Sequence, residues 1–176
     1  MNEQQLIEGC RKGDRKAQKT LYDLFSRKMM GVCLRYVNDR ETARDVLQEG
    51  FVKVFTAINS FSGSGSFEGW MRKIFVNCAL EYLRKSDVLR ESTDLDNTSE
   101  LIQPNSSVIA ELSAAELMKI VQELPDGFRM VFNMFAIEGY SHKEIADMLH
   151  ITESTSRSQY TRARQILQRR IDKLYE

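Results

Sequence analysis

The sequence predicts an all-helical protein made of two small helical domains joined by a flexible acidic linker. Apolar residues recur every three or four positions along most of the chain, as on the buried face of an amphipathic helix. No segment longer than a few residues alternates between apolar and polar side chains, so strands are not expected. The 25 basic and 25 acidic side chains cancel overall, but basic ends flank an acidic middle. We place the domains at 1–90 and 113–176 and the linker at 91–112.

The first domain is expected to contain four helices. Apolar spacing within 6–10 indicates a short first helix, and Asp14 is suited to cap a second helix that continues to about Val37. Asp39 precedes a third helix with apolar residues at helical spacing. The glycines and serines of 60–66 then break the helical pattern.

A fourth helix follows this loop and ends the first domain. Its apolar period resumes at Trp70, which shares a stripe with Ile74 and is therefore assigned to the core. The period ends at the basic residues Arg84 and Lys85. The next segment, 91–107, lacks a helical period and is rich in Ser, Thr, Asn and Asp, so it is interpreted as a linker.

The second domain ends in two helices joined by a tight turn. Ser141 and Glu144 form the pattern of a capping box, His150 interrupts the helix, and Thr152 can cap a second, longer helix. The apolar stripe expected on this longer helix consists of Ala163, Ile166, Leu167, Ile171 and Leu174.

The start of the last helix carries many polar and basic side chains, which we place largely outside its apolar stripe. Helices that enter the major groove of DNA use their N-terminal residues to contact bases and phosphates. The alternative is an amphipathic hairpin whose arginine-rich face is merely solvated. The DNA-binding candidates are Ser154, Ser156, Arg157, Ser158, Tyr160, Thr161 and Arg162.

Several other classes of protein are not expected. No apolar stretch approaches the ~20 residues that span a bilayer, and the N-terminal segment is too polar for a signal peptide, so a cytoplasmic protein is expected. The three cysteines, Cys10, Cys33 and Cys78, stand far apart among apolar residues and are interpreted as buried thiols. With two histidines available, no metal or other cofactor is predicted, and no catalytic motif indicates an enzyme.

Four fragments, in this order, resemble the bacterial sigma factors, specifically the extracytoplasmic-function (ECF) group. The resemblance covers nearly the whole chain and implies an all-helical factor without an active site, which binds RNA polymerase core enzyme and supplies promoter recognition and strand opening. It also implies an anti-sigma protein as a partner, and an acidic linker that threads toward the active-site and RNA-exit channels of the polymerase. The fragments are GDRKAQKTLYDLF, ETARDVLQEGFVKVF, FSGSGSFEGWMRKIFVNCALEYLRK and LPDGFRMVFNMFAIEGYSHKEIADML.

The resemblance also assigns roles to residues in the first domain. Asp45, Gln48, Glu49 and Phe51 fall on the motif that docks on the polymerase, although Phe51 lies on the apolar stripe and is equally compatible with the core. The loop between Phe61 and Phe67 corresponds to the element that captures an unstacked base of the minus-10 sequence. An aromatic residue at its rim would stack on that base, or both rings would turn inward. The further minus-10 candidates on the fourth helix are Arg72, Lys73, Asn77, Arg84 and Lys85.

In the second domain, the resemblance makes the last helix a reader of the minus-35 element. Two residues depart from the family pattern, in which glycine is usual at the positions of His150 and Ser154. The alternative function is a free-standing helix-turn-helix regulator whose N-terminal helices sense a ligand or dimerise. That alternative leaves the polymerase motif and the loop unexplained.

Overall fold

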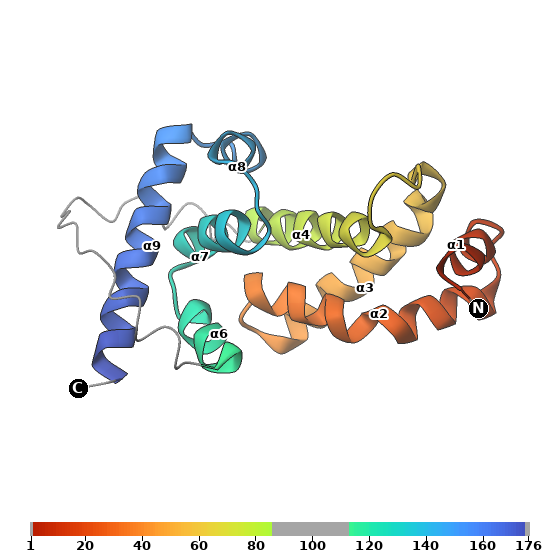
Figure 1. The fold of residues 1–176 in the computed structure, drawn as a ribbon, viewed down its shortest axis with the longest axis horizontal. Coiled ribbons are helices and arrows are strands. Elements are labelled where there is room, and N and C mark those ends of the chain that lie inside the picture. Colours follow the sequence, from red (N-terminus) through yellow and green to blue (C-terminus); the bar gives the residue numbers. More distant parts are fainter. Residues whose placement is uncertain (1, 86–112, 175–176) are drawn as a thin grey trace. The chain divides into compact units, whose positions relative to one another are not determined.

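The computed structural model describes residues 2–85 and 113–174, and every regular element in these ranges is a helix (Figure 1). The all-helical prediction is therefore confirmed for this part of the chain. The described residues form two compact units, with the boundary between Tyr82 and Leu83. The expected linker at 91–112 lies outside the described residues.

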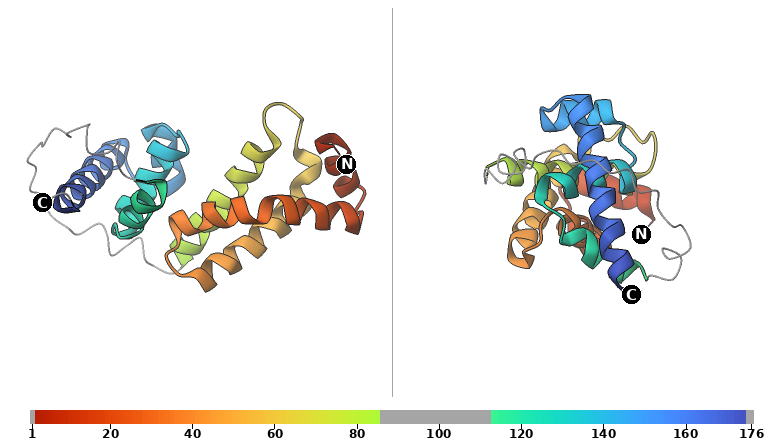
Figure 2. Two further views of the ribbon diagram at one scale, coloured as in Figure 1. Left: turned by 60° about the horizontal axis from the view of Figure 1, so that its bottom comes forward. Right: turned by 90° about the vertical axis from the view of Figure 1, so that its left-hand side faces the viewer.

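The helices of the N-terminal part follow one another closely along the chain. They are α1 (Glu3–Arg11), α2 (Arg15–Tyr36), α3 (Arg40–Ala57), the single 3-10 turn η1 (Ile58–Ser60) and α4 (Phe67–Lys85). Helices α2 and α3 pack against each other, and α1 packs against α2 (Figure 2).

The beginnings of these helices are fixed by side chains that accept from free backbone N–H groups. Asp14 accepts from the N–H of Lys16 and Asp39 from that of Thr42, as their positions in the sequence predict. Asn2 forms a capping box with Gln5 at the start of α1, which the sequence analysis did not identify. Polar caps therefore set where the apolar faces begin.

Aromatic rings from three helices meet in the core of this unit. The ring of Phe51 on α3 lies 4.7 Å from that of Tyr22 on α2 and 5.1 Å from that of Phe75 on α4, measured between centroids. Cys33 and Cys78 are fully buried nearby, and burial raises the pKa of the Cys33 thiol to about 12. The expectation that all three cysteines are buried free thiols is confirmed.

Gly50 lets the Phe75 ring lie directly on the backbone of α3. A Cβ atom built on Gly50 would lie 2.2 Å from Cε1 of Phe75. We therefore expect Gly50→Ala to lower the free energy of unfolding by about 1–3 kcal/mol, the usual range for overpacking, although alanine is the better helix former. Urea unfolding followed by the fluorescence of Trp70, the single tryptophan, measures this change.

Gly31 provides the matched control in α2, because a Cβ built there meets nothing within 4 Å. Gly31→Ala should be neutral or stabilise by up to about 1 kcal/mol. If the two substitutions had the same effect on the unfolding midpoint, close packing at Gly50 would not be the cause.

The C-terminal part contains two helices before the predicted hairpin. Together the elements are α6 (Ala114–Gln122), α7 (Asp126–Phe132), the π-helical turn η3 (Asn133–Ile137), α8 (His142–Leu149) and α9 (Glu153–Leu174). Helices α6, α7 and α8 all pack against α9. Their shared core consists of Ile120, Val121, Leu124, Phe128, Ala163, Leu167 and Ile171.

The apolar stripe predicted for α9 is correct except at its end. Ala163, Leu167 and Ile171 are buried and Ile166 is partly buried against the same core. Leu174 is 62% exposed, so its assignment to the core was wrong. Leu174 is the last described residue of α9 and lies three residues beyond Ile171, where the buried cluster ends.

Candidate nucleic-acid interface

The turn between α8 and α9 has the geometry that the sequence predicts. Ser141 and Glu144 form the capping box of α8, and the Thr152 hydroxyl accepts from the N–H of Thr155 at 3.0 Å to cap α9. His150 adopts the left-handed conformation, with φ 55° and ψ 43°. This explains why glycine is usual at this position, since few other residues adopt a positive φ without strain.

Four polar side chains form one exposed face on the first three turns of α9. Ser154, Arg157, Ser158 and Thr161 are all exposed and follow the i, i+3, i+4, i+7 spacing of a single helix face. The hydroxyls of Ser158 and Thr161 donate to the carbonyls of Ser154 and Arg157, each at 3.0 Å. These four side chains, which we call the α9 face, present one cation and three hydroxyls to solvent.

Arg157 is the exposed cation of the α9 face, and it is held in place by a carboxylate. Its Nη2 donates to Oε1 of Glu153, one turn earlier on the helix. The side chain is 62% exposed, so a phosphate or a guanine can approach the guanidinium from solvent.

Ser156 and Tyr160 face inward, unlike the α9 face. Ser156 is fully buried, and its Oγ lies 2.9 Å from Nδ1 of His142, so the assignment of Ser156 to a DNA surface was wrong. The ring of Tyr160 packs 4.6 Å from that of Phe135, which in turn stacks on His142 at 4.2 Å, measured between centroids. Tyr160 is partly buried and packs α9 against η3 and the start of α8.

The environment of His142 keeps its imidazole neutral over a wider pH range than usual. Burial lowers the pKa of His142, the nearby charge of Arg157 lowers it further, and Glu153 acts in the opposite direction. A neutral ring can lie flat against Phe135 and exchange a hydrogen bond with Ser156 without placing a second cation beside Arg157.

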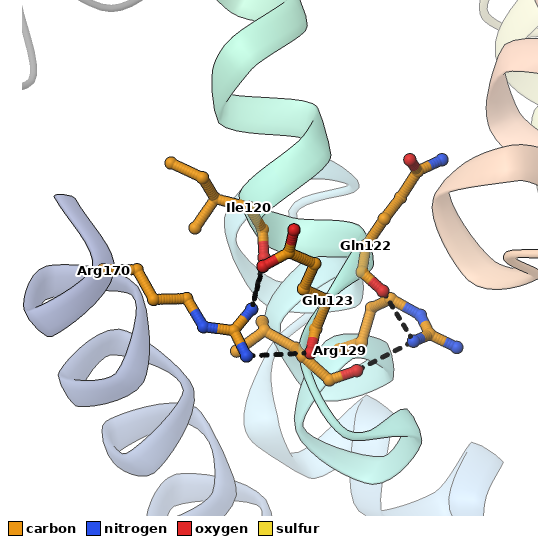
Figure 3. A network of polar contacts seen from close by, with 6 residues as sticks. Ile120, Gln122, Glu123, Arg129 and Arg170 are labelled. Carbon is orange, nitrogen blue, oxygen red and sulfur yellow. Dashed lines mark hydrogen bonds and ion pairs between the residues drawn. The ribbon is translucent and has the colours of Figure 1, made fainter. Parts of the chain in front are cut away.

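Two arginines fix α9 and the start of α7 to the end of α6, where backbone carbonyls lack helical partners. Arg129 is 2% exposed, and its Nη1 donates to the carbonyls of Gln122 at 3.2 Å and Leu124 at 2.8 Å (Figure 3). Its Nη2 pairs with the carboxylate of Asp126. Sequence reasoning missed this buried cation, although a lone arginine in the apolar run FRMVF was a signal for it.

Arg170 provides the second connection, from α9 itself. It donates to the carbonyl of Ile120 at 3.4 Å and to the carbonyl of Glu123 at 3.2 Å, and pairs with the Glu123 carboxylate at 2.9 Å (Figure 3). The C-terminal half of α9 is thereby anchored to α6. The exposed residues of the α9 face lie at the other, N-terminal end of the same helix.

The loop before α4 is anchored by the two phenylalanines that bracket it. Phe61 is 7% exposed and Phe67 1% exposed. Their rings lie 5.1 Å apart and both contact the ring of Trp70, which is partly buried. Of the two alternatives for these rings, the structure shows the inward one, because both rings complete the core beneath the loop. The exposed part of the loop is 62–66.

Polar side chains on α4 form a second exposed strip. Lys73 and Asn77 are exposed and Arg84 is half-buried, and their spacing of four and seven residues places them on one side of the helix. Lys85 is exposed at the end of α4, and Arg72 is half-buried on another side. We call Lys73, Asn77 and Arg84 the α4 strip.

The polymerase motif lies on an exposed side of α3, with one exception. Asp45, Gln48 and Glu49 are exposed, whereas Phe51 is 3% exposed and belongs to the core, so its role as an exposed anchor was wrong. Val52, which the sequence analysis missed, is 63% exposed. It follows Asp45, Gln48 and Glu49 at the i+7, i+4 and i+3 positions, so these four residues form what we call the α3 face.

In the described residues, no group of three or more His, Cys, Asp or Glu side chains is arranged to hold a metal ion. None of the described helices combines the length and apolar character needed to cross a membrane.

Both parts of the chain match known families. Residues 21–88 match the family described as Sigma-70 region 2, and residues 114–167 match Sigma-70, region 4. The α3 face and the α4 strip lie within the first match, and the α9 face lies within the second.

Individual relatives match nearly the full chain. The ECF RNA polymerase sigma-E factor of Haemophilus influenzae is 30% identical over 185 residues, covering 99% of this chain and 97% of that protein. The RNA polymerase sigma-H factor of Pseudomonas aeruginosa is 29% identical over 183 residues, covering 98% and 95%.

A solved structure shares the fold. It is the sigma factor RpoE from Bartonella quintana, crystallised with the anti-sigma factor NepR, with a TM-score of 0.54 and 20% identity over 90% of this chain and 98% of that one.

Proposed function

This chain belongs to the ECF group of the sigma-70 family, so it is a transcription initiation factor and not an enzyme, and we propose which part of it binds which element of the promoter. Residues 1–90 bind core polymerase and the minus-10 element, and residues 113–176 bind the minus-35 element. Residues 91–112 link the two. One observation carries the proposal: the exposed polar faces on α3, α4 and α9 fall within the segments that match regions 2 and 4.

The α3 face is the surface that binds core polymerase. Asp45 and Glu49 supply carboxylates for basic partner residues, Gln48 supplies an amide, and Val52 supplies the apolar contact first assigned to Phe51. Glu49 also pairs with Lys53 at 3.3 Å, and Lys53 in turn pairs with Glu81 of α4 at 2.6 Å. Phe51 acts indirectly, because its ring fixes α3 against α2 and α4.

The loop and the α4 strip bind the opened minus-10 element. Loop residues 62–66 are exposed, so their backbone can approach an unstacked base. On the α4 strip, Asn77 can read a base edge, while Lys73 and Arg84, with Arg72 and Lys85 beside them, hold the single-stranded phosphates. Phe61 and Phe67 support this site from the core.

The α9 face reads the minus-35 element as duplex DNA. Arg157 donates to guanine or phosphate, and the hydroxyls of Ser154, Ser158 and Thr161 donate or accept at neighbouring positions. Arg162 is half-buried and is suited to a phosphate at the edge of the interface. Tyr160 positions the start of α9 through its ring contacts.

Arg157→Ala is expected to weaken promoter binding by about 1–3 kcal/mol and to relax the base preference at one minus-35 position. The reason is the loss of the single exposed cation of the α9 face. Binding of holoenzyme to a promoter library with randomised minus-35 sequence measures both effects. Arg169→Ala, an exposed arginine near the other end of α9, is the control for lost charge. If both variants lost the same amount of promoter affinity and neither changed the base preference, direct recognition of a base by Arg157 would be contradicted.

The regulator of this protein is proposed to be an anti-sigma protein that binds it in the cytoplasm. The structural relative from Bartonella quintana was crystallised with such a factor. The residues that an anti-sigma protein would cover here include the α3 face, since covering that face prevents assembly with polymerase.

In vitro transcription with purified core polymerase on a promoter library tests the proposed function directly. We expect the purified chain to direct initiation at a sequence-defined subset of promoters. Absence of initiation at every template would refute the function. Binding to DNA without stable association with core would instead favour a free-standing helix-turn-helix regulator.

A further inference from the structure

A groove runs between α1 and the loop that precedes α4. It has a volume of about 980 Å³, and α1 forms one wall while the loop forms the other. From the loop, the lining residues are Phe61, Ser62, Gly63 and Gly65, and from α1 they include Gln5, Glu8 and Arg11. Helix α1 therefore borders the exposed loop directly.

Arg11, in the last turn of α1, holds the first residue of the loop. Its Nη2 donates to the carbonyl oxygen of Phe61 at 2.6 Å, and its Nη1 lies 3.7 Å from Oε2 of Glu8. The N–H of Phe61 donates to the carbonyl of Ile58 at 3.2 Å, and the Phe61 ring is buried against Phe67 and Trp70. The ring, the N–H and the carbonyl of Phe61 are therefore all fixed: the ring by α4, the N–H by Ile58 and the carbonyl by Arg11 of α1.

The rest of the loop is held in place mainly through its two ends. Gly63 and Gly65 have φ of 81° and 87°, and a Cβ at either position would meet nothing within 4 Å. The described contacts of the loop tip are local, such as the 2.9 Å contact between the hydroxyls of Ser62 and Ser64. At the far end, Ser66 Oγ accepts from the N–H of Gly69 at 3.2 Å and so joins the loop to α4.

We propose that Arg11 is a positioning residue for minus-10 recognition: it pins the Phe61 carbonyl and so presets the loop that receives the unstacked base. This inference rests on the proposed function of the loop. Fixing a loop before binding removes ordering entropy that binding would otherwise have to supply. Helix α1 is then part of the DNA-opening apparatus, although it lies N-terminal to the segment that matches region 2.

The test uses holoenzyme and a library of fork-junction DNA whose single-stranded minus-10 segment is randomised. Arg11→Met keeps the aliphatic stem and removes the donors, and Arg11→Lys keeps one donor and the charge. Arg15→Met, at the exposed start of α2 and outside the groove, controls for the lost charge. Gly63→Val distorts the loop itself, because valine is strained at a positive φ.

We expect Arg11→Met to weaken binding of the preferred fork junction about five- to tenfold and to reduce base preference at one single-stranded position. Arg11→Lys should restore part of the affinity and part of the base preference. Arg15→Met should leave the base preference unchanged and lower the affinity only by the small amount that the loss of any one positive charge causes. Binding of core polymerase and of minus-35 duplex should be unchanged. A merely structural role would not alter base preference selectively.

The outcomes separate this inference from the function on which it rests. If Gly63→Val abolishes base preference while Arg11→Met leaves it intact, the loop reads the base and the role of Arg11 is refuted. If Gly63→Val has no effect on preference or affinity, the loop does not capture a base and both proposals fail. If Arg11→Met lowers fork-junction and minus-35 binding equally, or only in proportion to its loss of thermal stability, positioning is refuted.

Discussion

Replacing Arg129 with alanine is expected to lower the free energy of unfolding of the C-terminal helices by about 3–5 kcal/mol. The change removes the donor shared by the carbonyls of Gln122 and Leu124 and leaves a cavity where a 2% exposed side chain stood. Buried carbonyls without a donor cost about 1–3 kcal/mol each, and truncating a large buried side chain adds to this. A loss of this size approaches the whole stability of a small helical domain.

Two spectroscopic signals locate this effect. Trp70 is the only tryptophan and reports on the N-terminal unit, whereas far-ultraviolet circular dichroism reports on all helices. Arg129→Ala should therefore lose ellipticity at a lower urea concentration while the tryptophan transition stays in place. Arg129→Met restores volume but not the donors, so it separates the cavity from the hydrogen bonds.

Arg170→Ala is the matched control for Arg129. Arg170 contacts the same end of α6, but its side chain is 34% exposed, and a solvent-exposed ion pair contributes little. We expect a loss of at most about 1 kcal/mol. Equal destabilisation by the two substitutions would show that burial of Arg129 is not what makes it important.

Replacing Asp45 and Gln48 together with alanine is expected to weaken binding to core polymerase at least a hundredfold. Truncating a hot-spot residue of an interface costs about 2 kcal/mol or more, and we expect both side chains to be hot spots because they lie on the α3 face beside Val52. Neither is buried, so the helical content and the unfolding midpoint should not change. Titration of fluorescently labelled core polymerase with the variant measures the loss.

Three further variants define the surface. Asp23→Ala removes an exposed carboxylate from α2 that pairs with Lys19, and it should leave polymerase binding unchanged. Val52→Asp should weaken binding without unfolding, because Val52 is 63% exposed. Phe51→Ala should unfold the helices around it instead. If the Asp45 and Gln48 double variant bound core polymerase with wild-type affinity, the α3 face would not be part of the interface.

Local signals in the sequence predicted the boundaries of most elements. Asp14 and Asp39 begin their helices, and His150 ends α8 in the left-handed conformation. Such features depend on side-chain to backbone hydrogen bonds within a few residues, so the chain near each position contains all the required information. The helical period likewise identified most of the core of α9.

Long-range packing limited the prediction of the candidate site. Phe51 and Val52 are adjacent apolar residues, and only the rings of Tyr22 and Phe75 decide that Phe51 is the buried one. Ser156 was placed outside the core because it is polar. Its position seven residues before Ala163, one of the buried residues of α9, is the signal that would have placed it inside. Its partner His142 comes from another helix, which no local pattern shows.

The ion pair between Arg157 and Glu153 has a consequence for the factor when no polymerase is bound. In the proposed role of Arg157, duplex DNA displaces the Glu153 carboxylate from the guanidinium, and because both side chains are exposed this costs at most about 1 kcal/mol. The ion pair therefore holds the free guanidinium at the surface of α9 without preventing its proposed contact with DNA.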